Sequence, residues 1–282
     1  MCSSSSPLAL LARDSRSPGS PRQPLPRNSH IPALGLTALA LLLCVQAWSP
    51  ASDEAQPLRR YLCHRATTPI VIDGRLDETA WRAAQIATRF TDIFHKDRRV
   101  ALQSRVRLLW DEDYLYASFA AMDDDVWATK TERDAALWEE EVVELYLDPD
   151  GDRLNYLEFE VNPLGTPIDL LIPYAGAQAE WQKCAQWNCA GLAAAARVFG
   201  TPDDRTDRDH GWTAELAIPF AALPAEQGVP PLAGTLWRAQ FFRIDRPADQ
   251  TEPSCSSWND TPVFHLPERF GELLFTEAQA VP

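Results

Sequence analysis

Residues 142–162, VVELYLDPDGDRLNYLEFEVN, decide the fold. In 142–147 and again in 156–162, apolar side chains alternate with polar or tyrosine side chains, which is the period-two pattern of a β-strand. The intervening Asp-Pro-Asp-Gly-Asp at 148–152 is typical of a turn. The stretch therefore predicts two neighbouring antiparallel strands joined by a hairpin.

The alternation places four polar side chains on one face of this predicted strand pair, with tyrosines beside them. They are Glu144, Glu158, Glu160 and Asn162. Carboxylates accept hydrogen bonds from hydroxyls, and aromatic rings stack on apolar surfaces, so this face suits a sugar. An ordinary solvated sheet face is the alternative, although adjacent like charges there are unfavourable. Trp138 precedes the first strand among acidic residues, which favours an edge or loop position over the core.

The rest of the domain shows the same short strands separated by turn residues. Such a series is typical of a β-sandwich. We therefore predict an all-β fold, an antiparallel sandwich of immunoglobulin or jelly-roll type with short helical insertions, one of them at 77–84. The further expected strands are 68–74, 101–110, 114–121, 168–173, 191–200, 212–218, 236–244 and 271–275.

The N-terminal part of the chain differs from the rest. Residues 1–30 are rich in Ser, Pro and Arg, and an apolar run at 31–44 is followed by small side chains. This run has the length of a signal-peptide core and is shorter than the roughly 20 residues of a membrane span. We predict a cleaved signal peptide at 1–47, a polar linker at 48–59 and one domain at 60–278, with a retained signal anchor as the alternative.

Charge limits the choice of partner and compartment. The chain has 40 acidic and 26 basic side chains and a net charge of −14. Nucleic-acid binding needs a basic surface, so nucleic acid is excluded as a partner. The predicted signal implies an exported protein, periplasmic or extracellular, with no stable membrane span after cleavage.

Four cysteines lie in the predicted domain: Cys63, Cys184, Cys189 and Cys255. An even number in an exported chain favours disulfides. We expect Cys184 to pair with Cys189 and Cys63 with Cys255, although four cysteines allow three pairings. A metal site at Cys184 and Cys189 is the weaker alternative, because the spacing is not that of a CxxC motif.

Six blocks of the sequence, taken in order, resemble family-nine carbohydrate-binding modules and the stand-alone proteins similar to them. The resemblance covers about residues 61–276 and implies a β-sandwich related to the DOMON group. It also implies non-catalytic carbohydrate binding in support of polysaccharide catabolism. The blocks are 70–81, 109–116, 138–148, 156–162, 211–219 and 265–271.

The resemblance also implies site residues. Similar modules attached to xylanases hold a terminal sugar between two Trp side chains, and the first of these falls on Trp138. Glu144 and Asn162 match two further family positions, whereas Glu160 replaces an Arg and Phe264 stands near the second Trp. His265 is either a sugar contact or a structural histidine, and Trp127 is a reserve aromatic. The expected ligand-binding residues are Trp138, Glu144, Glu158, Glu160, Asn162, Phe264, His265 and Trp127.

Family members bind structural calcium, so the resemblance makes calcium the one expected cofactor. Asp148, Asp150 and Asp152 are the candidate ligands. The same residues are also typical of an ordinary hairpin turn, and the distal Glu of an EF-hand loop is not at its place.

Three other readings compete with sugar binding. A glycoside hydrolase needs two carboxylates about 5–10 Å apart, which Glu144, Glu158 and Glu160 could supply. A haem-binding DOMON-type electron-transfer domain needs axial ligands such as Met122 and a histidine. A sandwich that only contacts protein is a third reading. The sequence favours a non-catalytic module over an enzyme.

Overall fold

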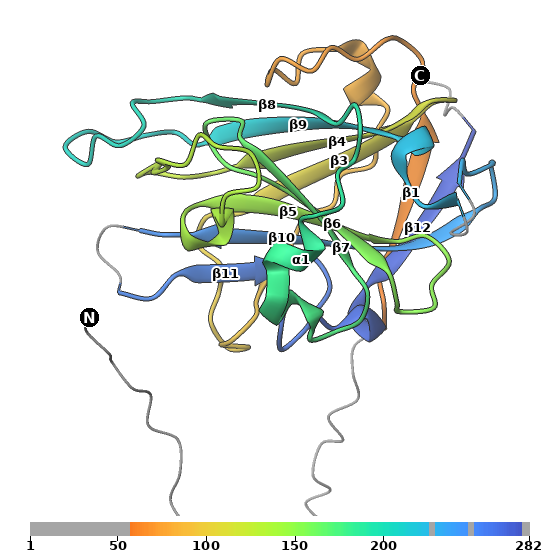
Figure 1. Cartoon of the computed structure of the whole chain (residues 1–282). Helices are drawn as coiled ribbons and strands as arrows, with labels where there is room; N and C mark the ends of the chain where they lie inside the picture. The colour runs from red at the N-terminus through yellow and green to blue at the C-terminus, as the bar shows by residue number, and fades with distance from the viewer. Residues whose placement is uncertain (1–56, 226–228, 248–250, 278–282) are drawn as a thin grey trace, which may run out of the picture. The chain divides into compact units, whose positions relative to one another are not determined.

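Figure 1 shows a computed structural model of the chain, which describes residues 57–225, 229–247 and 251–277. The predicted signal peptide and most of the predicted linker lie outside these residues. The strands are β1 (Arg60–Arg65), β2 (Thr91–Asp92), β3 (Ser104–Trp110), β4 (Tyr114–Ala121), β5 (Val142–Asp148), β6 (Tyr156–Val161), β7 (Pro167–Ile172), β8 (Ala193–Val198), β9 (Trp212–Pro219), β10 (Leu236–Asp245), β11 (Ser254–Ser257) and β12 (Gly271–Thr276). The helical segments are η1 (Thr79–Arg82), η2 (Leu137–Glu139), η3 (Ala177–Glu180), α1 (Trp181–Cys184), η4 (Phe220–Ala222) and η6 (Pro267–Arg269).

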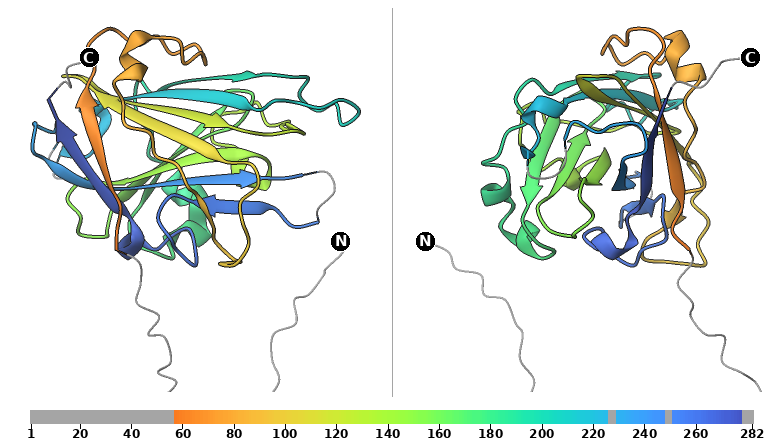
Figure 2. Two further views of the ribbon diagram at one scale, coloured as in Figure 1. Left: turned by 180° about the vertical axis from the view of Figure 1, so that it is seen from behind. Right: turned by 90° about the vertical axis from the view of Figure 1, so that its right-hand side faces the viewer.

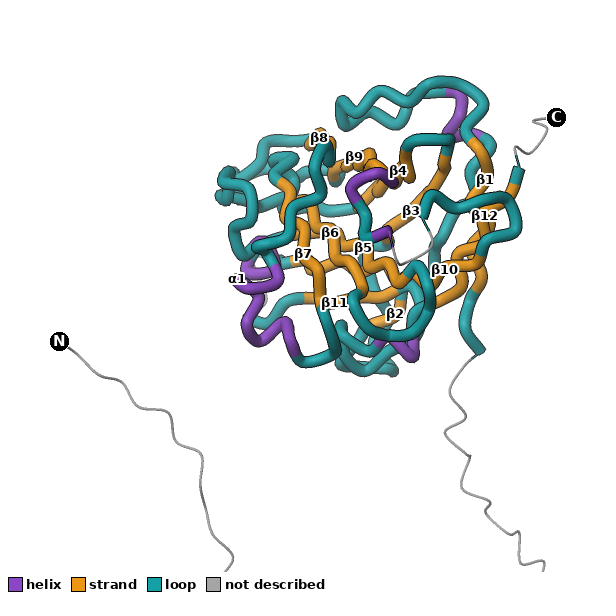
Figure 3. Tube along the Cα trace, turned by 45° about the vertical axis from the view of Figure 1, so that its right-hand side comes forward, coloured by secondary structure: helices purple, strands orange, loops and turns teal. Residues whose placement is uncertain are grey.

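The strands form a sandwich of two layers. Hydrogen bonds link them in the order β7-β6-β5-β10-β12-β1-β3-β4-β9-β8, with β11 beside β10 and β2 beside β11. In Figures 1 and 2, β8, β9, β4 and β3 lie over β7, β6, β5 and β10, and β1 and β12 join the layers at one end. The helical segments are short and lie outside the strands (Figure 3), and none in the described ranges could cross a bilayer. The predicted sandwich with short helical insertions is confirmed.

The main core lies between the two layers, and the predicted alternation accounts for it. Leu145 of β5 and Phe159 of β6 are fully buried there, opposite Phe119 of β4. Burial of each such side chain contributes about 1.5–3 kcal/mol. The side chains between these positions therefore point to the opposite face of the sheet.

That opposite face of β5 and β6 is also covered. Tyr146 and Tyr156 are buried in a second apolar cluster, which includes Leu137 of η2, Cys184 of α1 and Phe270. The cover therefore comes from η2, which precedes β5, from α1, which follows β7, and from the segment before β12. As a result, polar side chains on this face are enclosed.

The outer face of the other layer carries the N-terminal segment. Trp81 of η1 packs there, and its Nε1 donates a hydrogen bond to Glu215 at 3.0 Å. The other Glu215 oxygen accepts the backbone N–H of Gly74 at 3.0 Å. Gly74 has a φ of +80°, and a Cβ there would lie 2.6 Å from a backbone atom of Ala196. The helical turn is found as predicted, but the strand expected at 68–74 is wrong, because this segment is an irregular loop held by Glu215.

The sequence indicated an antiparallel sandwich, but the structure also contains parallel strand pairs. β1 lies parallel to β12 over five residue pairs and parallel to β3 over two. The sequence did not predict β1, β2 or β11. β2 and β11 have only two and four residues, too few to show an alternation.

The two predicted disulfides are not formed. All four cysteines of the described domain are free and buried. Cys63 lies in the main core, whereas Cys255 lies in the second cluster on the far side of the sheet. The Cys184 thiol donates to the carbonyl of Ala177 at 3.7 Å, and Cys189 lies in the main core. Neither pair therefore shares one packing environment. Burial raises the pKa of the Cys189 and Cys255 thiols to about 12.

Candidate functional site

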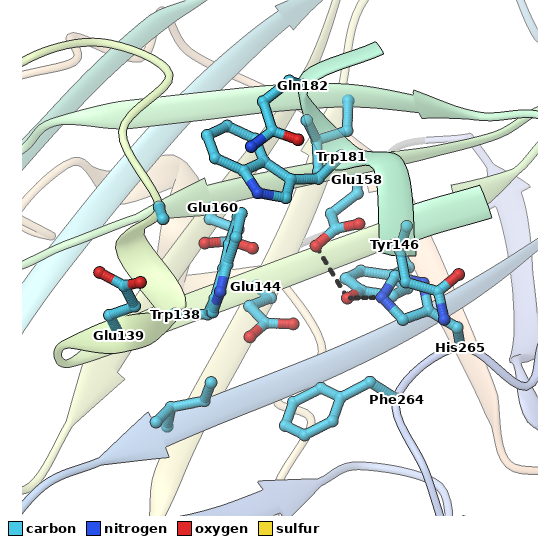
Figure 4. Close-up of a pocket in the computed structure, with 14 residues that line it drawn as sticks. Trp138, Glu139, Glu144, Tyr146, Glu158, Glu160, Trp181, Gln182, Phe264 and His265 are labelled. Atoms are coloured by element: carbon cyan, nitrogen blue, oxygen red, sulfur yellow. Dashed lines mark hydrogen bonds between the residues drawn. The ribbon is translucent and has the colours of Figure 1, made fainter. Parts of the chain in front are cut away.

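A cavity of about 500 Å³ lies on the covered face of β5 and β6 (Figure 4). The two strands supply its floor. The walls come from η2, from the segment of η3 and α1, and from the loop before η6. The lining residues are Ala136, Trp138, Glu139, Glu144, Tyr146, Glu158, Glu160, Leu170, Gln178, Trp181, Gln182, Ile244, Phe264 and His265.

Three carboxylates form the floor. Glu144 of β5 lies directly opposite Glu160 of β6, and Tyr146 lies opposite Glu158. Cross-strand neighbours project from the same face of an antiparallel pair, so the three acids converge. Their ligand oxygens lie within 4.8 Å of one another, and each side chain is at most 3% exposed.

The floor is electrostatically strained. Burial raises the pKa of Glu144 and Glu160 well above the ordinary range, and the neighbouring carboxylates raise it further. The Tyr146 hydroxyl donates to Glu158 Oε1 at 2.8 Å. The Oε2 atom of each of the three acids has no hydrogen-bond partner among the described residues. Three buried acceptors at the bottom of the cavity therefore lack a donor in the described part of the chain.

Aromatic side chains form the walls. Trp138 of η2 and Trp181 of α1 meet edge to face, with ring centroids 5.0 Å apart. Phe264 packs on Phe242 of β10 with centroids 4.9 Å apart. In Figure 4 the Glu144 carboxylate lies between the Trp138 and Phe264 rings. Apolar rings thus flank the acidic floor.

Two polar anchors hold the turn that carries Trp138. Arg246, just after β10, donates to the backbone carbonyls of Trp138 at 2.8 Å and Glu140 at 3.2 Å. The buried Glu140 carboxylate accepts the backbone N–H groups of Thr129 at 2.7 Å and Lys130 at 3.1 Å. The hydrogen bonds to Glu140 outweigh its burial and lower its pKa. The Trp138 backbone is therefore fixed independently of any ligand.

His265 lines the cavity and also joins a tyrosine network. Its Nδ1 lies 2.9 Å from the Tyr156 hydroxyl, and its Nε2 lies 3.4 Å from the Tyr146 hydroxyl. Burial lowers the pKa of His265, so the ring is neutral at neutral pH. The structure thus gives His265 a structural role at the edge of the site, and a sugar contact stays a prediction.

Asn162 does not reach the cavity, although the sequence placed it on the same face. β6 ends at Val161, and the Asn162 amide is used in the following turn. Its Nδ2 donates to the Lys130 carbonyl at 2.8 Å, and its Oδ1 accepts the N–H of Thr166 at 2.9 Å. Its side chain is fully buried, so the structure assigns it to the β6–β7 connection.

Trp127 also lies outside the cavity. It is half-buried in the loop after β4, and the Arg205 guanidinium lies 5.7 Å from its ring centroid. The backbone next to it is tied to Asp203, which accepts the N–H of Ala128 at 2.9 Å. The reserve aromatic of the sequence prediction therefore belongs to another surface.

The three aspartates of the hairpin turn lie together, with ligand oxygens within 4.8 Å of one another. Asp148 accepts the backbone N–H of Gly151 at 2.9 Å and of Arg153 at 3.1 Å, and Asp152 accepts that of Leu154 at 2.7 Å. These bonds account for the turn without an ion. The oxygens have the chemistry that calcium prefers, and calcium binding here stays a prediction.

Sequence reasoning missed Trp181, Gln182 and Gln178. They lie in the insertion between β7 and β8, which has no strand-like periodicity. One signal was present, because Trp181 stands between Glu180 and Gln182, as Trp138 stands among acids. A Trp next to polar residues is thus the sequence signal that Trp138 and Trp181 share.

The sequence matches the family model "Carbohydrate-binding family 9" over residues 71–275. This stretch carries β2 to β11 and most of β12, and it includes the whole cavity. The chain therefore belongs to carbohydrate-binding family 9, as the motifs had indicated.

Individual relatives agree with this assignment. The chain is 32% identical over 88 residues to endo-1,4-beta-xylanase A of Thermotoga maritima, a match that spans 31% of this chain and 8% of that enzyme. A family 9 module from Caldicellulosiruptor kristjanssonii, solved with cellotriose, has a TM-score of 0.54 and 17% identity over 79% of this chain and 98% of that chain. A candidate carbohydrate-binding protein from Bacteroides uniformis has a TM-score of 0.59 and 18% identity over 78% and 100%. At these identities the two structures show a shared fold.

Proposed function

We propose that the chain binds a carbohydrate, without catalysis, in the cavity over β5 and β6. One observation carries the proposal: the aromatic walls of Trp138 and Phe264 enclose three carboxylates whose Oε2 atoms lack partners. The apolar face of a sugar ring would stack on the aromatic side chains, and its hydroxyls would donate to the acids. The cavity volume lies in the range of about 300–1,000 Å³ that is usual for small-molecule sites.

The relatives support the same class of ligand. The Caldicellulosiruptor module was solved with cellotriose, and the local sequence match is to part of a xylanase. We infer a role beside polysaccharide breakdown, in an exported protein whose signal peptide is removed. The described residues offer no support for haem, because Met122 is 55% exposed and the His64 ring is hydrogen-bonded to Thr276 at 2.7 Å.

Isothermal titration against gluco- and xylo-oligosaccharides tests the proposal. Trp138→Ala removes one wall, and we expect it to weaken saturable binding at least tenfold. Trp127→Ala is the matched control, because this half-buried Trp lies outside the cavity. Equal losses in the two variants, or no binding of any glycan by the parent protein, would contradict the proposal.

A further inference from the structure

The floor of the cavity holds three clustered carboxyl groups, and neutral sugars do not require such a cluster. Glu144, Glu158 and Glu160 form no ion pair among the described residues, and no Lys or Arg lines the cavity. The fourth lining acid, Glu139, is exposed at the rim and is paired with Lys130. Three clustered acids are therefore left without a cation.

The neighbouring titratable groups do not neutralise the floor. Tyr146 donates one hydrogen bond, to Glu158, and burial raises the pKa of Tyr146 itself. His265 is held by two tyrosine hydroxyls, and burial lowers its pKa. Burial of carboxylates without a counter-charge is costly, so the protonated forms of Glu144 and Glu160 are favoured in the free protein.

The three acids of the floor match the donors of an ammonium group. Three acids line the cavity together without a cation, and an ammonium carries three N–H donors beside its carbon substituent. Charge-assisted hydrogen bonds of this kind are about twice as strong as neutral ones. Aromatic faces such as those of Trp138, Trp181 and Phe264 also attract cations.

The walls distinguish an organic cation from a bare metal ion. A metal ion would occupy the acidic floor and leave Trp138 and Phe264 without a contact. The volume of about 500 Å³ instead suits a ring that carries the charge. On this geometry, which rests on the proposed function, we propose that the cavity is selective for sugars with a free amino group, whose ammonium binds among Glu144, Glu158 and Glu160.

Paired titrations test this selectivity at a pH below the pKa of the sugar amine. The amino sugars are glucosamine and fully deacetylated chitobiose, and the neutral partners are glucose and cellobiose. We expect the amino sugar of each pair to bind at least tenfold more tightly. Binding should also release protons, which is measured by repeating the titration in buffers of different ionisation enthalpy.

Variants connect the selectivity to the floor. Glu160→Gln should reduce the amino-to-neutral affinity ratio at least tenfold, while Glu112→Gln, at an exposed carboxylate outside the cavity, should leave it unchanged. Glu144→Gln serves as a second floor variant should Glu160→Gln fail to fold, as judged by thermal unfolding. An amino-to-neutral affinity ratio that is unchanged in both floor variants would overturn the proposal.

The remaining outcomes separate this inference from the general function. Equal or tighter binding of glucose and cellobiose would overturn amine selectivity and leave carbohydrate binding intact. Failure of every sugar to bind would overturn both proposals. Saturable binding of Ca²⁺ alone, lost in Glu160→Gln and not displaced by glucosamine, would show a metal site instead.

Discussion

Trp181 packs edge to face against Trp138, with ring planes at 83° and centroids 5.0 Å apart. The two indoles come from different insertions, η2 before β5 and α1 after β7. Trp181 therefore buttresses the side chain of Trp138, while Arg246 fixes its backbone. One wall of the cavity is thus assembled from two residues that lie more than 40 positions apart in the sequence.

Replacing Trp181 should weaken sugar binding less than replacing Trp138. An aromatic pair of this geometry contributes about 0.5–1.5 kcal/mol beyond its buried area, so Trp181→Ala should weaken binding by a factor of about 2 to 13. Trp181→Phe should recover part of that loss. Titration with the best-bound sugar measures both, and a loss in Trp181→Ala that exceeds that in Trp138→Ala would contradict the buttress role.

Loss of the hydrogen bonds that hold the Trp138 backbone should also weaken sugar binding, although Arg246 does not line the cavity. Arg246→Ala removes two hydrogen bonds to the turn, and we expect a roughly tenfold weaker affinity from the lost positioning. The global stability should change by less than about 1 kcal/mol, because the turn lies at the periphery. Arg208→Ala is the control, since Arg208 is exposed and pairs only with Asp124 in the described contacts. Unchanged affinity in Arg246→Ala would rule out the anchor.

Glu141 makes the protein less stable as the pH rises. It is fully buried beside Asp123 and Asp245, and burial, followed by Asp123, raises its pKa to about 11. The folded state thus keeps a proton that the unfolded state loses above about pH 4.5, so this contribution to stability is full below pH 4.5 and declines up to pH 11. Glu141→Gln should reduce the slope of unfolding free energy against pH by up to about 1.4 kcal/mol per unit.

Urea unfolding between pH 4 and pH 9 measures that slope. The variant should match the parent at pH 4 and exceed it in stability at pH 9. Glu112→Gln, at an exposed carboxylate, is the control and should follow the parent throughout. A parallel displacement of the Glu141→Gln curve at all pH values would contradict the titration of Glu141.

Glu215 holds the N-terminal segment to the sandwich. It accepts the backbone N–H groups of Asp73 and Gly74 and the Trp81 indole N–H, and burial raises its pKa to about 7. Glu215→Ala leaves buried donors unpaired and should cost about 3 kcal/mol of unfolding free energy. Glu215 lies in the layer opposite the cavity, so sugar affinity should remain within twofold. A large loss of affinity in a folded Glu215→Ala protein would show that the two faces are coupled.

Local periodicity was enough to predict most of the strands and the acids of β5 and β6 that share one face. Alternation in 142–147 and 156–162 fixed which side chains share a face, whereas the register that sets Glu144 opposite Glu160 depends on the turn between the strands. The alternation could not show where β6 stops. Asn162, one residue past the strand, was therefore assigned to the same face, while its amide forms the next turn.

The cover of the cavity and the state of the cysteines depend on tertiary structure. The insertion that carries Trp181 has no repeat that indicates which face it covers. Closeness in sequence likewise suggested that Cys184 and Cys189 would pair, but a disulfide requires Cβ atoms directed at each other. The end of α1 instead directs Cys184 into the second cluster, while Cys189 enters the main core.

The parallel pairing of β1 with β12 sets the order in which the sandwich can be completed. β1 shares five residue pairs with β12 but only two with β3, so the earliest strand depends on the last one. During synthesis, the hydrogen-bonded link between the two layers cannot form until residues near 276 have emerged. Contacts this distant in sequence make closure slow, and a chain truncated before β12 would expose the edge of β10 to other strands.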